Sequence, residues 1–346
     1  MEKFFTIVIP TYNSKRLKPG LDSIESQSHK ELLEVIIVDD NSSDKSHLEL
    51  LKHYTFDYKI IENTINFGPG GARQVGLDAA KGKWVTFLDH DDEFNPDCFH
   101  LIKQEIENSK CEAMFDTQII VAENENWILS GKYVVTSEDC WLHGRFFNRN
   151  FLTKNGIRFH TKIFAQEDIY FCSLVTGILM IDPKYREYGA AASSLVTYYW
   201  YLWEDSTSHK KEKDRSYIVN HFDDYITSNY DGYKFIYSLY PDETLKEIKL
   251  TSCLMYCYLF YEKFSFAYRN TGQDVSDILY HTKRYKDILL KEMNITNDKL
   301  IELMNDDIRA EMYYMFIKKV NECLDGFFIP QRTITDFILL LDNYDK

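Results

Sequence analysis

An acidic cluster directly after an apolar run is the feature of this sequence most suited to chemistry. Residues 84–88 are mostly apolar, and Asp89, Asp91 and Asp92 follow them, with His90 in between. A buried strand that ends in carboxylates presents them at the rim of its sheet. There a hard divalent cation can bind them together with the phosphates of a substrate. The pattern therefore predicts metal-assisted chemistry on a phosphorylated substrate.

Two more segments carry polar side chains at the ends of predicted strands. One reads Val-Ile-Pro-Thr-Tyr-Asn over residues 8–13, and the other reads Ile-Ile-Val-Asp-Asp-Asn-Ser-Ser-Asp over residues 36–44. Tyr12 could stack on a nucleobase while Asp40 accepts a hydrogen bond from a base N–H. Four residues here are also good helix N-cap types, and both interpretations can hold together: Asn13, Ser14, Asn41 and Ser43.

A glycine-rich loop opens a predicted helix. Residues 66–73 read Asn-Phe-Gly-Pro-Gly-Gly-Ala-Arg. Backbone N–H groups at a helix N-terminus, together with the guanidinium of Arg73, would suit a diphosphate. A tight turn between a strand and a helix has the same composition, so the loop alone leaves both interpretations open.

An acidic pair begins a helix later in the chain. Glu167 and Asp168 precede an apolar-periodic segment, which places them in the first helical turn. A carboxylate there could act as a general base. Carboxylates in a first turn also stabilise a helix through its dipole, without any chemistry.

The elements that must position these residues alternate between strand and helix over residues 4–120. The predicted strands are 5–9, 35–38, 58–61, 84–88 and 114–121. The predicted helices are 17–27, 46–53, 70–80 and 96–108. Such a series predicts an α/β fold with a mainly parallel sheet covered on both faces, and ligands of such sheets bind at the carboxyl ends of strands.

The rest of the chain divides near a charged run at residues 209–214. Residues 122–213 mix short strands, turns and a helix at 166–176. Beyond 214 the pattern is aromatic and helical, with helices predicted at 217–229, 245–264, 275–293, 297–323 and 333–342. We therefore expect a domain over 1–213, made of halves 1–121 and 122–213, and a C-terminal helical region over 214–346.

Composition limits the class of partner. The chain has 346 residues, 45% of them hydrophobic, and a formal net charge of −14, which disfavours nonspecific binding to nucleic acid or to anionic membranes. Seven scattered cysteines without a CxxC pair indicate reduced thiols in a cytoplasmic protein, with no disulfide framework and no zinc site. The N-terminus lacks signal-peptide features and no stretch reaches about 20 apolar residues, so we expect peripheral membrane contact at most.

Taken together, these motifs resemble family 2 glycosyltransferases of the GT-A fold. The resemblance covers roughly residues 4–210 and follows the family's order and spacing, from the segment at 8–13 to the acidic pair Glu167-Asp168. It implies an inverting transferase that uses a nucleotide-diphosphate sugar, with UDP-sugars favoured, and Mn²⁺ or Mg²⁺ as cofactor. The C-terminal region lies outside it.

The resemblance also implies roles for single residues. Asp168 would be the catalytic base, with Glu167 beside it. Asp89 and Asp91 match the D-x-D motif, and Asp91 would bind the metal with His209, which follows an aromatic segment at 198–203. The residues implied in binding the nucleotide sugar are Pro10, Tyr12, Asp39, Asp40, Asn66, Gly71, Arg73, Asp89 and Asp92.

Several alternatives remain open. The acceptor would be a hydroxyl group of a surface polysaccharide, a teichoic acid or a lipid-linked glycan, or else of a protein or a hydroxylated DNA base. The aromatic helices after 214 could form a homo-oligomer or dock the acceptor. Other classes are a nucleotidyltransferase, which would be expected to carry a basic glycine-rich loop directly after the first strand, and a noncatalytic nucleotide- or glycan-binding module.

Overall fold

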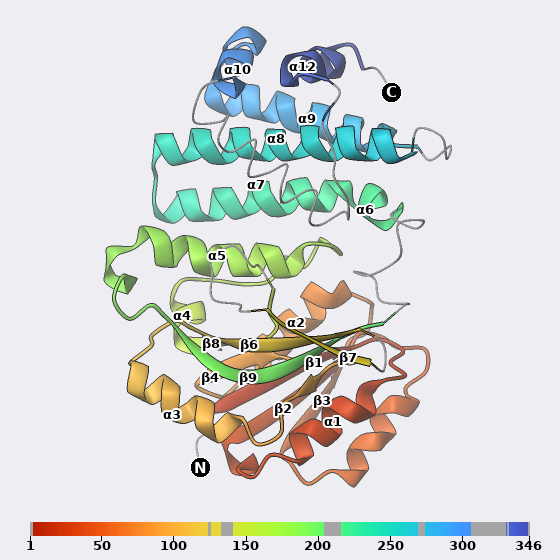
Figure 1. Ribbon diagram of the computed structural model, residues 1–346, viewed down its shortest axis with the longest axis vertical. Helices are drawn as coiled ribbons and strands as arrows, with labels where there is room; N and C mark the ends of the chain where they lie inside the picture. The colour runs from red at the N-terminus through yellow and green to blue at the C-terminus, as the bar shows by residue number, and fades with distance from the viewer. Residues whose placement is uncertain are drawn as a thin grey trace. The chain divides into compact units, whose positions relative to one another are not determined.

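The computed structural model describes residues 3–123, 126–132, 141–203, 216–268, 274–305, 330 and 332–344. The chain divides into two compact units, Met1–His209 and Lys210–Lys346. The first unit is built around a sheet and the second is helical (Figure 1). The two units are described separately below.

In the described part of the first unit, the sheet has nine strands. In spatial order they are β3 (Tyr58–Glu62), β2 (Leu33–Asp39), β1 (Phe5–Thr11), β4 (Trp84–Phe87), β8 (Arg145–Asn148), β6 (Met114–Glu123), β9 (Ala190–Leu202) and β5 (Glu93–Phe94), with β7 (Asn126–Lys132) paired to β6. The first four strands are parallel, as is the β6–β9 pair, whereas β8, β5 and β7 pair antiparallel. The predicted α/β sheet flanked by helices is confirmed, but the whole sheet is mixed.

Two layers of helices cover the sheet (Figure 1). The helices of this unit are α1 (Leu17–Glu25), α2 (Gly68–Ala79), α3 (Phe99–Ser109), α4 (Arg149–Lys154) and α5 (Glu167–Ile181), with 3₁₀ turns η1 (Lys30–Leu32), η2 (Ser46–His53) and η3 (Pro183–Tyr185). Every residue of β1 and β2 is buried. Burial on both faces explains why these strands read as continuous apolar runs.

Alternation along β1 decides which helix packs on which face. Ile7 shares a core cluster with Leu21 of α1 and Phe99 of α3. Val8 points to the opposite face, where a Cβ added at Gly76 of α2 would come within 2.3 Å of its side chain. Successive strand side chains point to opposite faces, so α1 and α3 cover one face and α2 covers the other.

Helix α5 packs on the same face as α2. Its Phe171 stacks on Phe159 with ring centroids 4.1 Å apart, and it meets Phe87 of β4 edge-on at 6.0 Å. Phe87 is in register with Val8 across the β1–β4 pair. The N-termini of α2 and α5 therefore approach the same edge of the sheet.

Several predicted helices differ from those observed; among them, the helix predicted at 166–176 continues to Ile181, and the one predicted at 217–229 is divided between α6 (Ser216–Asn220) and α7 (Phe222–Leu239). The segment predicted at 46–53 forms a 3₁₀ turn, and the helix predicted at 96–108 begins at Phe99. Helix α1 ends at Glu25 instead of continuing to Gln27. The side chain of Gln27 is buried and bonds to backbone groups at the start of α3, so a tertiary contact replaces the last helical residues.

The second unit is a set of helices around its own core. They are α6 (Ser216–Asn220), α7 (Phe222–Leu239), α8 (Glu243–Tyr268), α9 (Ser276–Met293), α10 (Asn297–Met304) and α12 (Ile334–Asp342). Buried aromatic and aliphatic residues of α8, such as Tyr258 and Leu254, lie at the centre. The helix predicted at 297–323 corresponds to α10 at its start, and residues 306–329 lie outside the described part of the chain.

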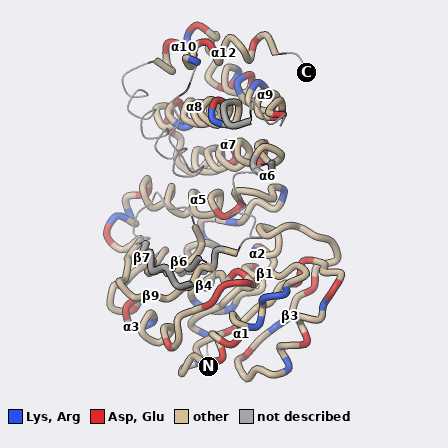
Figure 2. The backbone as a smooth tube through the Cα atoms, turned by 45° about the vertical axis from the view of Figure 1, so that its right-hand side comes forward, with Lys and Arg blue, Asp and Glu red and all other residues tan. Residues whose placement is uncertain are grey.

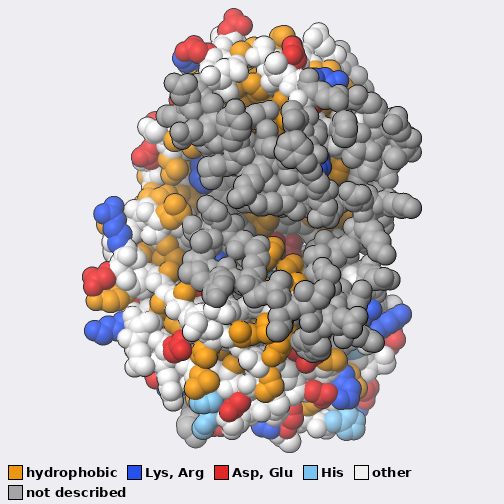
Figure 3. All heavy atoms as spheres, in the orientation of Figure 1, with side chains coloured by type: hydrophobic (Ala, Val, Ile, Leu, Met, Phe, Trp, Pro, Cys, Tyr) orange, Lys and Arg blue, Asp and Glu red, His pale blue; other side chains and the backbone are white. Residues whose placement is uncertain are grey.

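Surface features of the described residues are mixed. Figure 3 shows hydrophobic side chains reaching the surface of the first unit in small patches between charged ones. Large apolar side chains that remain exposed near the sheet edge include Tyr12, Ile65, Phe67 and Phe164. Among the helices described, none combines the length and apolarity needed to cross a membrane.

Candidate active site

The carboxyl ends of β1, β2 and β4 meet at one edge of the sheet, as predicted. Thr11 is in register with Asp39, and the N–H of Asp40 donates to the carbonyl of Thr11 at 2.8 Å. Pro10 is buried within β1, whereas Tyr12 directly after the strand is 52% exposed. The ring of Tyr12 is therefore accessible at the edge of the sheet where Asp40 also lies.

The two adjacent aspartates after β2 have different partners. Asp39 is fully buried, accepts from the N–H of Ser42 at 3.1 Å and lies 3.4 Å from Nε2 of His47. Asp40 accepts from Nδ2 of Asn63 at 2.8 Å and from the N–H of Phe67 at 3.0 Å. Asp39 thus organises its own loop, while Asp40 connects that loop to the start of α2.

Asn13 joins the loops after β1 and β2. Its φ is +47°, a left-handed conformation that asparagine tolerates better than most residues. Its side-chain oxygen accepts from the N–H groups of Ser43 and Asp44 at 3.0 and 3.1 Å. The N-caps of α1 and η2 are Arg16 and Lys45, so the helix-cap interpretation of these two segments is wrong.

The glycine-rich loop allows close packing of α2. A Cβ added at Gly70 would lie 2.9 Å from Cβ of Glu167, and one added at Gly71 would lie 2.3 Å from Cβ of Phe67. Gly68 has φ +75°, and its N–H donates to Oδ1 of Asn66 at 2.9 Å. These glycines therefore have a packing and turn function in addition to any contact with a ligand.

Arg73 connects three segments that are far apart in sequence. Its Nη1 lies 2.7 Å from Oε1 of Glu167, and its Nη2 lies 2.6 Å from Oδ1 of Asp89. Burial alone would raise the pKa of Asp89, but Arg73, with His143 nearby, holds that pKa well below its usual range. The guanidinium thus bridges the carboxylate after β4 and the acidic pair of α5.

The acidic pair lies at the buried start of α5. Burial, with Asp168 beside it, raises the pKa of Glu167 to about 7 in spite of its ion pair with Arg73. Burial also raises the pKa of Asp168, against the effect of Arg73. Asp168 accepts from the N–H of Ile169 at 2.7 Å. Glu167 therefore forms an ion pair with Arg73, whereas Asp168 accepts a hydrogen bond from a backbone N–H in the first turn of its own helix.

The aspartates after β4 also have different hydrogen-bond partners. Asp92 is buried and accepts from the hydroxyl of Tyr198 at 2.8 Å and the N–H of Tyr201 at 2.9 Å. These bonds attach the loop after β4 to strand β9, which is a structural function that the sequence does not reveal. The carbonyl of Asp91 accepts from Nε1 of Trp203 at 3.2 Å, and burial raises the pKa of the Asp91 carboxyl.

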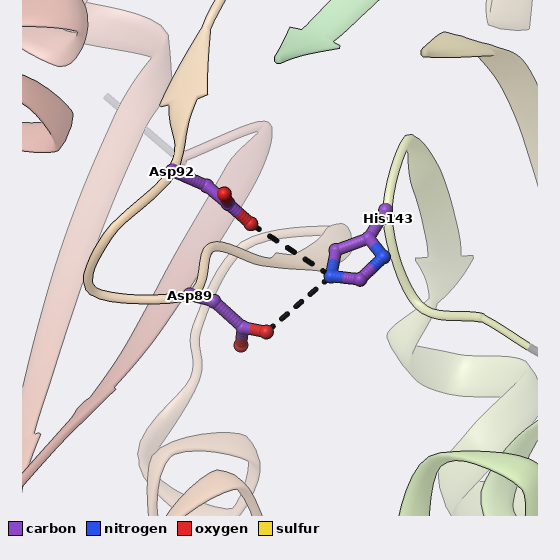
Figure 4. Close-up of side chains that lie close together, drawn as sticks. All are labelled: Asp89, Asp92 and His143. Atoms are coloured by element: carbon purple, nitrogen blue, oxygen red, sulfur yellow. Dashed lines mark hydrogen bonds and ion pairs between the residues drawn. The ribbon is translucent and has the colours of Figure 1, made fainter. Parts of the chain in front are cut away.

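His143 is a site residue that sequence reasoning missed. Its Nε2 lies 3.3 Å from Oδ2 of Asp89 and 3.8 Å from Oδ2 of Asp92 (Figure 4). The imidazole stacks on Trp200 with ring centroids 5.0 Å apart. A single histidine just before β8 has no spacing that relates it to the acidic cluster, so no sequence signal points to it.

These residues fit a divalent cation. One ligand atom from each of Asp89, Asp92 and His143 lies within 4.8 Å of the others. Burial, with Asp89 and Asp91 nearby, raises the pKa of Asp92 well above its usual value, and a cation would relieve this repulsion between carboxylates. Carboxylate oxygens with an imidazole suit Mn²⁺. His209, predicted as a ligand, lies outside the described residues.

Comparison with known proteins adds independent information. Residues 6–166 match the model of glycosyl transferase family 2. The poly(ribitol-phosphate) beta-glucosyltransferase of Bacillus spizizenii is 44% identical over 93 residues, which are 25% of this chain and 14% of that protein. The GalNAc(5)-diNAcBac-PP-undecaprenol beta-1,3-glucosyltransferase of Campylobacter jejuni is 38% identical over 92 residues, or 25% and 29% of the two chains. The chain thus spans less than a third of the length of either relative.

The fold also matches solved structures. The crystal structure of S. aureus TarS 1–349 in complex with UDP superposes with a TM-score of 0.58 at 18% identity, covering 95% of this chain and 94% of that one. At this identity the likeness concerns the fold. Residues 6–166 of the first unit therefore belong to glycosyl transferase family 2, and the structural likeness shows the GT-A fold.

Proposed function

We propose that this chain is an inverting glycosyltransferase that moves a sugar from a UDP-sugar to an acceptor hydroxyl. One observation carries the proposal. The carboxylates after β4 and the acidic pair of α5 meet at Arg73, with 2.6 Å to Asp89 and 2.7 Å to Glu167. The carboxylates after β4 could bind the donor diphosphate through a divalent cation. The acidic pair of α5 could take a proton from the acceptor.

The donor class is supported by the relatives. Crystal structures of TarS 1–349 contain UDP or UDP-GlcNAc. Here Tyr12 is exposed and directly follows Thr11, whose carbonyl accepts from the N–H of Asp40, and an exposed ring at this edge suits stacking on a uracil base. Pro10 and Asp39 shape this part of the site from within the strands, and Asn66 fixes the adjacent turn.

Asp168 is the proposed base. In the reaction, the acceptor oxygen attacks the anomeric carbon as Asp168 takes the proton of the acceptor hydroxyl. The bond from the anomeric carbon to the diphosphate oxygen breaks, and its electron pair leaves with UDP. Because attack and departure occur on opposite sides of the carbon, the configuration inverts. Glu167, paired with Arg73, is less free to take this proton than Asp168.

Asp89, Asp92 and His143 are the clustered residues that would hold Mn²⁺ or Mg²⁺, and Asp91, predicted as a ligand from the sequence, is proposed to join them although it is not part of this cluster. His209 stays a predicted further ligand. When bound, the cation would supply a Lewis acid that stabilises negative charge on the departing diphosphate. The His143 ring, stacked on Trp200, orients its nitrogen toward the carboxylates, which fixes one side of this donor set.

The names of two relatives support the proposed acceptor class. One acts on poly(ribitol-phosphate) and another on a sugar linked to undecaprenol diphosphate. We propose a glycan hydroxyl of this kind, on a surface polysaccharide, a teichoic acid or a lipid-linked intermediate. The helical second unit is proposed to dock the acceptor or to mediate self-association.

The test is a panel of nucleotide sugars with and without Mn²⁺, comparing wild type with Asp91→Ala and Asp168→Asn. We expect metal-dependent UDP release from one sugar, lost in Asp91→Ala. Lys103→Ala, on the outer side of α3, is the control and should behave as wild type. Turnover of a nucleoside triphosphate without turnover of any nucleotide sugar would replace the glycosyltransferase with a nucleotidyltransferase.

A further inference from the structure

We infer that Arg73 is a positioning residue, which fixes the acidic pair of α5 relative to the carboxylates after β4 instead of binding the nucleotide. The inference rests on the proposed function and deepens it. It concerns how the base Asp168 comes to its place, and it departs from the role that the sequence implied for Arg73.

The guanidinium of Arg73 is buried and paired with carboxylates of two different segments. Its side chain is 8% exposed, and its two terminal nitrogens each bind a carboxylate oxygen, on Glu167 and on Asp89. The third nitrogen, Nε, is buried and has no hydrogen-bond partner among the described residues. The guanidinium is thus enclosed between two elements of the protein. It is planar, always charged and weakly hydrated, which suits a buried ion pair with each of two carboxylates.

Helix α2 also packs against the segment that leads into α5. A Cβ at Gly68 would lie 2.8 Å from the ring of Phe164, and a Cβ at Gly70 would lie 2.9 Å from Cβ of Glu167. One helical turn after Gly70, Oε1 of Gln74 accepts from the N–H of Phe159 at 2.8 Å. Residues 159–167 are therefore docked along α2 by steric, hydrogen-bond and ionic contacts, and Arg73 supplies the ionic contact.

The consequence concerns the two acids of α5. With Glu167 neutralised by Arg73 and held against Gly70, its backbone is fixed at the first helical turn. Asp168 follows in the same turn, so its carboxylate takes its direction from that anchor. A shift of about 1 Å at a reacting group can cost on the order of 10²-fold in rate. Loss of the anchor should therefore slow the chemical step without weakening nucleotide binding.

The experiment compares four variants with wild type. They are Arg73→Gln, Glu167→Gln, the double variant that carries both of these changes, and Arg73→Lys. Turnover of the donor found in the nucleotide-sugar panel is measured beside UDP affinity by calorimetry. We expect each single change to lower kcat at least tenfold while the KM for the donor and the Kd for UDP stay within about twofold. The double variant should lose no more than either single one, and Arg73→Lys should recover part of kcat. Arg158→Gln is the control, because Arg158 pairs with Asp78 on the exposed side of α2.

A tenfold weaker Kd for UDP in Arg73→Gln, multiplying with the effect of Glu167→Gln, would overturn the inference and make Arg73 a nucleotide ligand. If Arg73→Gln fails to fold, Gly70→Ala replaces it. The added methyl group of this variant would lie 2.9 Å from Cβ of Glu167 and displace that residue, which should lower kcat. Unchanged kcat in a folded Gly70→Ala would also contradict the inference.

A readout independent of turnover separates this inference from the proposed function. Hydrogen exchange of backbone amides at residues 166–170 should be at least tenfold faster in Arg73→Gln or Gly70→Ala than in wild type. If wild type binds no UDP and turns over no sugar, the proposed function fails, while the exchange result still decides the positioning role. Unchanged exchange at 166–170 would exclude it.

Discussion

At the scale of single residues, Asp168 is the group on which the proposed chemistry depends most. Its carboxylate bonds to the N–H of Ile169, and it is not paired with Arg73, which binds Glu167 instead. We predict that Asp168→Asn lowers kcat on the order of 10²–10⁴-fold, because a positioned base contributes about that much. UDP affinity should stay unchanged by calorimetry. Asp182→Asn, at the other end of α5, is the matched control, and a similar kcat loss there would mean that helix stability was responsible.

The pH profile gives a second test of the same residue. Burial raises the pKa of Asp168 above its ordinary value of 3.8. A base works only when deprotonated, so kcat/KM should fall as the pH is lowered through this raised pKa. The acidic limb should therefore lie at higher pH than for an exposed aspartate, and the residual activity of Asp168→Asn should lack it. A limb below pH 4 in wild type would contradict the assignment.

His143 allows a prediction about metal binding. His143→Phe keeps a ring to stack on Trp200 but removes the nitrogen that lies 3.3 Å from Asp89. We expect Mn²⁺ affinity, measured by calorimetry or electron spin resonance, to fall roughly 10- to 100-fold, the usual effect of losing a ligand or its supporting partner. His100→Phe on α3 is the control. Equal Mn²⁺ affinity in wild type and His143→Phe would remove this histidine from the metal site.

Sequence patterns could predict those parts of the site that depend on a single local segment. The carboxylates after β4 could be located because they follow a strong apolar run, and the acidic start of α5 because it precedes an apolar-periodic segment. The bridge through Arg73 could not be predicted, because residues 73, 89 and 167 meet only once α2 and α5 cover the same face. The structural partners of Asp92, Tyr198 and Tyr201, come from a strand more than 100 positions away, and His143 has no pattern at all.

At the scale of elements, Gln27 joins two helices. Its Nε2 donates to the carbonyl of Asn95 at 2.9 Å, and its Oε1 accepts from the N–H of Cys98 at 2.9 Å, at the start of α3. Gln27→Ala would remove both bonds from buried backbone groups. We expect a loss of roughly 2–4 kcal/mol in the free energy of unfolding, measured by urea denaturation.

The control for Gln27 is Gln104→Ala on the exposed side of α3, which should change the free energy of unfolding by less than about 0.5 kcal/mol. A loss of that small size in Gln27→Ala as well would mean that water replaces the missing side chain. The start of α3 would then be stable without its contact to α1.

The fold was predictable where strands are central and buried. Strands β1, β2 and β4 are continuous apolar runs, and their positions follow from the sequence. The second half of the sheet was not predictable in the same way, because β6 pairs parallel with β9 and antiparallel with β8, and these partners lie far apart in the chain. The 3₁₀ turn η2 has a helical pattern, and periodicity alone does not distinguish it from an α-helix.

At the scale of the whole molecule, the Lys and Arg of the described residues do not gather on one face in the view of Figure 2. Figure 2 shows acidic and basic residues interspersed along the described backbone of both units. The formal net charge is −14, so a polyanionic acceptor would be repelled unless a cation in the site compensates. By charge alone, a neutral glycan hydroxyl is therefore favoured as the proposed acceptor over a DNA base, and also over a polyanionic teichoic acid. The cytoplasmic location expected from the cysteines stays a prediction.

The two units have separate cores. The core around β1 contains residues between Phe5 and Tyr198, and the core around α8 contains residues between Val219 and Leu341, with none in common. Each cluster is large enough to stabilise a domain by itself. We therefore propose that the domain boundary expected near residue 213 separates two independently folding parts.

The prediction is that a fragment of residues 1–213 folds and binds UDP within about threefold of the full chain, because every described residue proposed to contact the nucleotide or the metal lies before 204. The fragment 214–346 should show its own cooperative unfolding transition by calorimetry and retain any self-association seen by sedimentation. A fragment of residues 1–189 is the matched control: it lacks β9, which pairs with β6 and β5, and should not fold. If fragment 1–213 were unfolded like this control, the second unit would be part of the folding unit of the first, and its proposed role in docking or self-association would have to be tested in the full chain.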